Sequence, residues 1–203
     1  MNQKIKVFVS DLGNVLIPFD YEIPLKKISD IYSGLGERFI DFYKKKYHVH
    51  RAFEKGEISE SDFISVLLEG VENKFDEEQI CKLYSEIFVV NKELVALLPE
   101  IKKHYKLVLL SNTNSIHMKY GWGGYDFIKL FDKLILSHEV KSVKPEEAIY
   151  RAVEKWTGEA PEAHFFIDDI PEYIEGAKKC GWDGVVFKDT DSLIRELKSR
   201  DIL

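Results

Sequence analysis

The sequence IKVFVSDLGNVL, residues 5–16, joins a short β-branched run to an acid at Asp11 and a glycine at Gly13. Residues 5–9 have the composition of a buried strand. The carboxylate therefore follows a strand directly, at the edge where open α/β sheets bind ligands. An acid in this position is also a common turn residue, so Asp11 alone does not establish a site.

Four further runs have the same character, at residues 107–110, 133–136, 165–167 and 184–187. Helical periodicity fills the intervals between the later runs, and Pro145 and Gly158 mark the two ends of one helix. Alternating strands and helices predict a parallel sheet with helices on both faces. The fold class is therefore α/β, a doubly wound, Rossmann-like parallel sheet.

The interval 18–91 differs from the rest, because it has helical periodicity and no convincing strand. We predict a core of residues 1–17 and 92–203, with residues 18–91 inserted as a helical cap. An insert after the first strand lies over the ligand-binding edge of the sheet and can act as a lid. We interpret the aromatic residues at helical spacing within it as cap core: Phe39, Phe42, Tyr43 and Tyr47.

The composition is that of an ordinary globular protein, with 203 residues, 45% hydrophobic and 32% charged. A net charge of -6 without a basic stripe argues against binding to nucleic acid. No apolar run has membrane-spanning length, and no signal peptide precedes the first strand. We therefore read Cys81 and Cys180 as reduced thiols and predict a cytoplasmic protein. The sequence leaves the oligomeric state open.

Three more polar groups follow strands or precede a helix. The second strand ends in Ser111 and Asn112, Lys144 precedes Pro145, and the run 165–167 is followed by Asp168 and Asp169. A hydroxyl, an amide and an ammonium can hold phosphate oxygens, and paired acids suit a hard divalent cation. Each group alone is commonplace. Together with Asp11 at one edge of a sheet, they predict a phosphate-handling site.

This order of motifs resembles the haloacid dehalogenase superfamily, whose four motifs are an Asp nucleophile, a Ser or Thr, a Lys and an acidic pair. The resemblance spans nearly the whole chain, and the insert resembles the helical cap of the subclass that includes sugar phosphatases. The segments 11–15, 110–114 and 168–169 are especially similar to the branch that contains bacterial α-D-glucose-1-phosphate phosphatase.

The resemblance implies that Asp11 attacks phosphorus and becomes an acyl phosphate. The other Asp11 oxygen and the Gly13 carbonyl would coordinate magnesium (Mg²⁺), with Asp169 completing the metal site and Asp168 beside it. The implied activity is a magnesium-dependent phosphatase of small phosphorylated metabolites.

On the phosphate side, the resemblance implies that Ser111, the backbone of Asn112 and Lys144 hold the transferring phosphoryl oxygens. Phosphoryl transfer requires alignment and neutralisation of charge, which these groups supply.

Two positions depart from the superfamily pattern. Gly13 replaces a second Asp that serves as general acid and base, and Tyr173 replaces an Asn or Asp that supports the metal. Without that acid, leaving groups that are stable unprotonated suffer least. We therefore expect anomeric phosphates such as glucose 1-phosphate, and acyl and aryl phosphates, to be preferred over alkyl phosphates. Asp20 is the nearest other carboxylate in the sequence.

Two other functions compete with a phosphatase. The loss of the acid at Gly13 is compatible with a catalytically weak or inactive binding or regulatory protein. A 2-haloacid dehalogenase would use Asp11 to attack carbon without a metal, but Asp168 and Asp169 argue against it, because that chemistry needs no cation-holding acids.

Overall fold

The computed structural model describes residues 4–203 and contains one five-stranded parallel sheet with strand order β3-β2-β1-β4-β5. The central strand is β1, in which Val9 pairs with Val108 on one side and Phe166 on the other. The predicted doubly wound α/β fold is confirmed. Residues 1–3 of the predicted core segment lie outside the described residues. The strands are β1 (Val7–Ser10), β2 (Lys106–Ser111), β3 (Lys133–Leu136), β4 (His164–Asp168) and β5 (Asp183–Val186).

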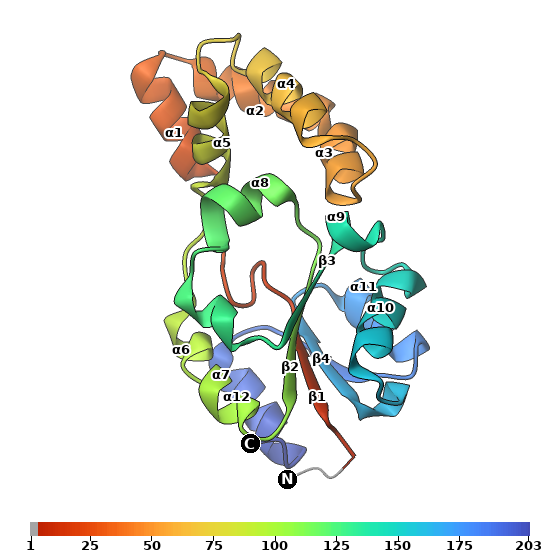
Figure 1. Cartoon of the computed structure of the whole chain (residues 1–203). Coiled ribbons are helices and arrows are strands. Elements are labelled where there is room, and N and C mark those ends of the chain that lie inside the picture. The colour runs from red at the N-terminus through yellow and green to blue at the C-terminus, as the bar shows by residue number, and fades with distance from the viewer. Residues whose placement is uncertain (1–3) are drawn as a thin grey trace.

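Helices cover both faces of the sheet, as Figure 1 shows. Side chains alternate along β1, so that Phe8 faces one apolar cluster while Val7 and Val9 face the other. The Phe8 face is covered by α6 (Lys92–Val95), α7 (Leu98–Lys102) and α12 (Thr190–Ser199). The opposite face is covered by α10 (Glu147–Thr157) and α11 (Pro171–Lys179).

Short helical segments complete the core part of the chain. They are α8 (Ser115–His117), the π-helical turn η1 (Met118–Trp122), the 3₁₀ turns η2 (Asp126–Leu130) and η3 (Pro161–Ala163), and α9 (Ser137–Val140).

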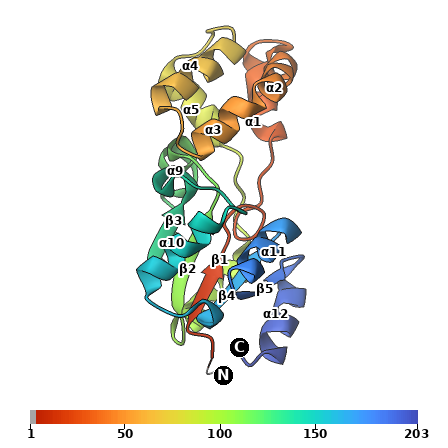
Figure 2. The same cartoon turned by 90° about the vertical axis from the view of Figure 1, so that its right-hand side faces the viewer.

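The interval between β1 and β2 begins with five helices that gather beyond the carboxyl ends of the strands (Figures 1 and 2). They have an apolar cluster of their own, which includes Ile28, Phe39 and Phe63. We call this part the helical cap and keep residues 18 and 91 as its proposed limits. Its helices are α1 (Glu22–Ile31), α2 (Leu35–Lys45), α3 (Tyr47–Glu54), α4 (Glu60–Gly70) and α5 (Glu77–Ser85).

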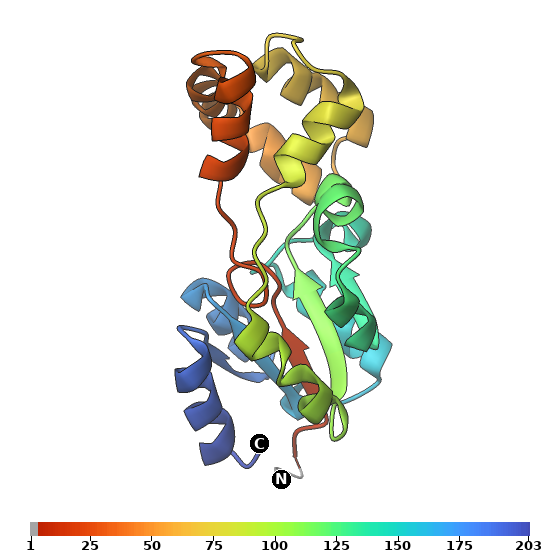
Figure 3. The ribbon, with the colours of Figure 1, turned by 90° about the vertical axis from the view of Figure 1, so that its left-hand side faces the viewer.

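Two linkers that run side by side join the helical cap to the sheet (Figure 3). The backbone amide of Asp20 donates to the Ile87 carbonyl at 2.7 Å, and that of Val89 donates to the Pro18 carbonyl at 2.8 Å. Hydrogen bonds between the two linkers restrict the movement of both. The helical cap is therefore held over the ends of the strands more firmly than a single flexible connection would hold it.

A second connection ties the loop after α3 to the core helix α9. Ser137 Oγ lies 2.6 Å from the Glu54 carbonyl oxygen, and Lys141 Nζ donates to the Gly56 carbonyl at 2.6 Å. Gly56 has a φ of +68°, and a Cβ there would lie 2.4 Å from the His138 carbonyl oxygen. The close approach of this loop to the core therefore requires glycine.

Within residues 4–203, none of the helices combines the length and the apolar character that crossing a bilayer requires. Cys81 and Cys180 are both buried free thiols, in agreement with the sequence-based expectation.

Candidate active site

The predicted site residues meet where the winding direction of the sheet reverses. The chain proceeds from β1 outward to β2 and β3, and then returns to place β4 on the other side of β1. Ligands bind at such a switch point, outside the carboxyl ends of the strands. Asp11 follows β1 and Asp169 follows β4, and both line a cavity of about 200 Å³ together with Gly13, Ser111 and Lys144.

Lys144 lies at the centre of this arrangement with only 1% of its surface exposed. Its Nζ is 2.7 Å from Asp11 Oδ1 and 2.6 Å from Asp168 Oδ2. Burial alone would lower the pKa of Lys144, but the charges of Asp11 and Asp168 outweigh it and raise that pKa above its ordinary value. The ammonium is therefore permanently charged and fixed beside the predicted nucleophile.

Asn112 fixes the backbone at Lys144. Its Oδ1 accepts from the Lys144 amide at 2.8 Å, and its Nδ2 donates to the Lys144 carbonyl at 3.1 Å. The ring centroid of Tyr173 lies 5.1 Å from Lys144 Nζ, within the range of a cation–π contact. Tyr173, which departs from the superfamily pattern, thus contacts the lysine.

The segment after Lys144 differs from the prediction that a helix starts at Pro145. The amide of Glu146 donates to the Val143 carbonyl at 2.7 Å, so a tight turn precedes α10, which begins at Glu147. Lys144 therefore acts through its own charge, because it lies outside the first turn of the helix.

Three carboxylates converge beside Lys144. Asp11, Asp168 and Asp169 each offer an oxygen within 4.8 Å of the others. Burial raises the pKa of Asp11 to about 7, against the lowering effect of Lys144, and burial together with the Asp168 charge raises the pKa of Asp169. One ammonium does not balance three acids, and their oxygen donors suit a hard divalent cation.

The two acids of the pair have different surroundings. Asp168 is fully buried, with Oδ2 on Lys144 and Oδ1 accepting from the Ile170 amide at 2.8 Å. Asp169 is half-buried, lines the cavity and accepts from Asn14 Nδ2 at 3.3 Å. Asp169 is thus the acid whose oxygen atoms are more accessible to a metal ion, while Asp168 forms an ion pair with Lys144. Direct contact of Asp168 with a metal stays a prediction.

Ser111 ends β2 and lines the cavity, as predicted for a phosphate-binding hydroxyl. Asn112 lines it as well, although its side chain is engaged by Lys144. Asp20 is not among the residues that line the cavity, and its Oδ1 accepts from the Glu22 amide at 2.8 Å at the start of α1. The position of Asp20 gives it no part in the site.

The roof of the cavity comes from α3 of the helical cap, which the sequence analysis did not assign to the site. Tyr47, His50, Arg51 and Glu54 all line the cavity. Glu54 lies 3.2 Å from His50 Nε2 and 2.7 Å from Arg51 Nη1. Burial raises the pKa of Glu54, but His50 and Arg51 reverse this and lower it.

The spacing of these four residues is a signal that was available in the sequence. Positions 50, 51 and 54 lie three, four and seven residues after position 47, so all four occupy one face of a helix. Polar and aromatic side chains on one face of a lid helix indicate contact with a polar site.

Known proteins resemble this chain in sequence. A family model described as haloacid dehalogenase-like hydrolase matches residues 8–187. A phosphorylated carbohydrates phosphatase of Thermotoga maritima is 26% identical over 174 residues, covering 80% of each chain.

Solved structures resemble the whole chain. A HAD family enzyme of Bacteroides thetaiotaomicron, BT-2542, crystallised with magnesium and inorganic phosphate, is 29% identical with a TM-score of 0.79, covering 93% of this chain and 98% of the other. The L-2-haloacid dehalogenase of Xanthobacter autotrophicus, at 22% identity and a TM-score of 0.65, shares the fold, with coverage of 98% and 84%.

Proposed function

The chain belongs to the haloacid dehalogenase-like hydrolases, and from this membership we propose that it is a magnesium-dependent phosphatase that acts through a phosphoaspartyl intermediate at Asp11. One observation carries the proposal: Asp11 lies 2.7 Å from a buried lysine, and Asp169 lines the same cavity. Magnesium and phosphate in BT-2542, and the activity in the name of the Thermotoga relative, support it.

The chain's own groups account for the two displacements at phosphorus. An Asp11 oxygen attacks phosphorus, the ester P–O bond breaks, and the leaving oxygen keeps the electron pair and takes a proton from solvent. Water then attacks phosphorus and gives up a proton to solvent, the bond to Asp11 breaks with the electron pair left on its carboxylate, and phosphate leaves. Lys144 and Ser111 neutralise and align the transferring oxygens throughout.

Asp11, Asp169 and the carbonyl of Gly13 would hold magnesium, with Asp168 beside them. The donor set fits, because its oxygen atoms converge and because burial, and after it the charge of Asp168, raises the pKa of Asp11, so that a cation would favour its ionised form. Bound magnesium supplies positive charge that favours the ionised Asp11 and an anionic substrate in one cavity.

We propose that the substrates are small phosphorylated metabolites with stable leaving groups. Gly13 supports this choice, because it cannot protonate a departing alkoxide. Glucose 1-phosphate represents the sugar members of this class, and acyl and aryl phosphates are the others. We further propose a cytoplasmic location, which the free thiols Cys81 and Cys180 support.

The proposal is tested by measuring phosphate release from p-nitrophenyl phosphate, glucose 1-phosphate and glucose 6-phosphate, with and without magnesium. We expect magnesium-dependent release, faster from the 1-phosphate than from the 6-phosphate, and its loss in Asp11→Asn. Asp20→Asn is the matched control, since its side chain lies outside the cavity and Asn can still accept a hydrogen bond from the Glu22 amide. Equal or faster hydrolysis of the 6-phosphate would contradict the leaving-group argument.

A second candidate, a binding protein without turnover, is favoured only by Gly13. It predicts that phosphate binds in the presence of magnesium while the wild type releases none from any ester. Chloride release from 2-chloropropionate tests dehalogenation, and we expect none.

A further inference from the structure

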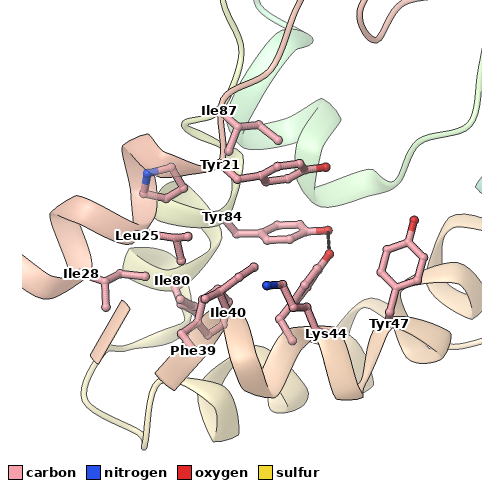
Figure 4. Close-up of a pocket in the computed structure, with 12 residues that line it drawn as sticks. Tyr21, Leu25, Ile28, Phe39, Ile40, Lys44, Tyr47, Ile80, Tyr84 and Ile87 are labelled. Atoms are coloured by element: carbon pink, nitrogen blue, oxygen red, sulfur yellow. Dashed lines mark hydrogen bonds between the residues drawn. The ribbon is translucent and has the colours of Figure 1, made fainter. Parts of the chain in front are cut away.

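A second cavity, of about 460 Å³, lies inside the helical cap among α1, α2 and α5. Figure 4 shows the side chains that surround it, including Leu25, Ile40 and Ile80. Of the twelve residues that line it, only the exposed Lys44 carries a charge. Its volume is within the range of small-molecule pockets, and its walls are almost wholly apolar.

We call this second cavity the cap pocket. It adjoins the cavity that contains Asp11 and Lys144, which we call the catalytic cavity. Tyr21, Tyr47 and Ile87 line both. A molecule whose phosphate is held at Asp11 and Lys144 can therefore extend past these three side chains into the cap pocket.

Two of the four tyrosine hydroxyls in the pocket wall, those of Tyr43 and Tyr84, already have partners. The Tyr43 hydroxyl lies 2.7 Å and the Tyr84 hydroxyl 2.9 Å from His50 Nδ1, and the two hydroxyls are 3.3 Å apart. A sugar ring packed against the apolar wall at Leu25, Ile40 and Ile80 would give up hydrogen bonds to water without replacing them, at a cost in free energy. An aryl ring loses no such bonds and gains contact with the rings of Tyr21 and Tyr84, which lie one above the other in Figure 4.

We propose that the cap pocket binds the apolar body of the substrate, so that the preferred substrates are aryl monophosphates carrying an apolar substituent. This inference rests on the proposed phosphatase function and narrows its substrates from stable leaving groups in general to apolar phenols. Two independent features agree on this class: Gly13 requires a leaving group that departs unprotonated, and the pocket requires an apolar one.

The first test compares phenyl phosphate with 4-butylphenyl phosphate on the wild-type enzyme. The two phenols that leave have almost equal pKa values. A difference in kcat/KM therefore reports burial of the butyl group rather than a difference in leaving-group chemistry. Each buried methylene is worth about fourfold in affinity, and we expect a gain of at least about tenfold. A gain below twofold, or a higher kcat/KM for glucose 1-phosphate than for 4-butylphenyl phosphate, would overturn the inference.

A matched pair of variants locates the effect. Ile40→Trp fills the pocket from α2, where Ile40 is half-buried, whereas Ile31→Trp makes the same change at a side chain 59% exposed at the end of α1. We expect Ile40→Trp to remove the advantage of the butyl group, and Ile31→Trp to keep both that advantage and the wild-type hydrolysis of phenyl phosphate. An equal loss of kcat/KM on both substrates in Ile40→Trp, or the same loss in Ile31→Trp, would mean that the butyl group binds elsewhere.

Binding of non-hydrolysable phosphonates separates this inference from the proposed function. Calorimetry with magnesium should show tighter binding of 4-butylbenzylphosphonate than of benzylphosphonate to wild type, and no difference in Ile40→Trp. If the phosphonates bind in this order while no ester is hydrolysed, the pocket assignment stands and the phosphatase proposal fails. If esters are hydrolysed but the phosphonates bind equally, the pocket assignment fails alone.

Discussion

The ring of Phe19 lies 3.3 Å from the point that a Cβ at Gly13 would occupy. Phe19 comes from the first linker to the helical cap, and both residues line the catalytic cavity. Where the superfamily pattern places a general acid, this chain has an apolar ring above a glycine. The absence of the acid is therefore built into the packing of the linker and not only into residue 13.

This packing predicts how an acid can be restored. Gly13→Asp alone must displace Phe19 by a few tenths of an ångström, whereas Gly13→Asp with Phe19→Ala has room for the carboxyl group. A positioned acid contributes about 10²–10⁴ to rate. We expect the double variant to raise kcat for glucose 6-phosphate at least about tenfold. For p-nitrophenyl phosphate, whose leaving group needs no proton, we expect little change.

Phe19→Ala alone is the control, and it should not favour either substrate. An equal gain on both substrates in the double variant would show that added space, and not the acid, is responsible.

Lys144→Met tests the buried ion cluster. The change leaves Asp11 and Asp168, which are 6% and 0% exposed, without their cation. Removing one partner of a buried ion pair typically costs about 3–5 kcal/mol of stability. We expect a loss of this size in urea unfolding without magnesium, together with loss of phosphatase activity.

Lys82→Met provides the comparison, because Lys82 pairs with Glu78 on the exposed surface of α5 at 2.6 Å. It should unfold close to the wild-type midpoint and retain activity. If Lys144→Met were as stable as Lys82→Met, the two acids would have to be neutral in the wild type.

The positions of the acids at the edge of the sheet were predictable from sequence, because a strand pattern and an acidic residue coincide there. In β1 and β4 the β-branched and aromatic runs end directly at acids, so the strand pattern locates Asp11 and Asp169 together. The predicted ends of β3 are confirmed, and those of the other strands shift by one or two residues. At the carboxyl ends of β2 and β4 the cause is that backbone pairing continues past the apolar run, to Ser111 beside Leu136 and to Asp168 beside Val186.

The contribution of the helical cap was not predictable in the same way. Helical spacing indicates that residues share a face, but not whether that face meets the cap interior or the sheet. Phe39 is buried in the cap as expected, whereas Tyr47 is 51% exposed and borders both cavities. The role of Asn112 in holding Lys144 depends on contacts between distant segments, which no local pattern encodes.

Magnesium binding should depend on pH. Because burial raises the pKa of Asp11 from 3.8 to about 7, the metal-free folded protein retains a proton there that the unfolded chain loses above about pH 4. This proton stabilises the folded state at low pH, and the stabilisation is lost as pH rises through 7. Magnesium requires the carboxylate, so its affinity should fall about tenfold per pH unit below 7 and level off above it.

Calorimetric titration with magnesium in buffers of different ionisation enthalpy measures this linkage. We expect release of about one proton per ion at pH 6 and almost none at pH 9. Proton release that is the same at both values would mean that Asp11 is already ionised in the metal-free protein.

Ser137 determines how firmly the helical cap is seated. Its buried hydroxyl accepts from the Thr113 amide at 3.0 Å and lies 2.6 Å from the Glu54 carbonyl oxygen on the cap. Ser137→Ala leaves these buried groups unpaired, which should cost about 1–3 kcal/mol in urea unfolding. Because Glu54 closes the catalytic cavity, KM for p-nitrophenyl phosphate should also rise. Ser65→Ala, which removes an exposed hydroxyl on α4, should change neither quantity, and equal effects in both variants would disprove the role of Ser137.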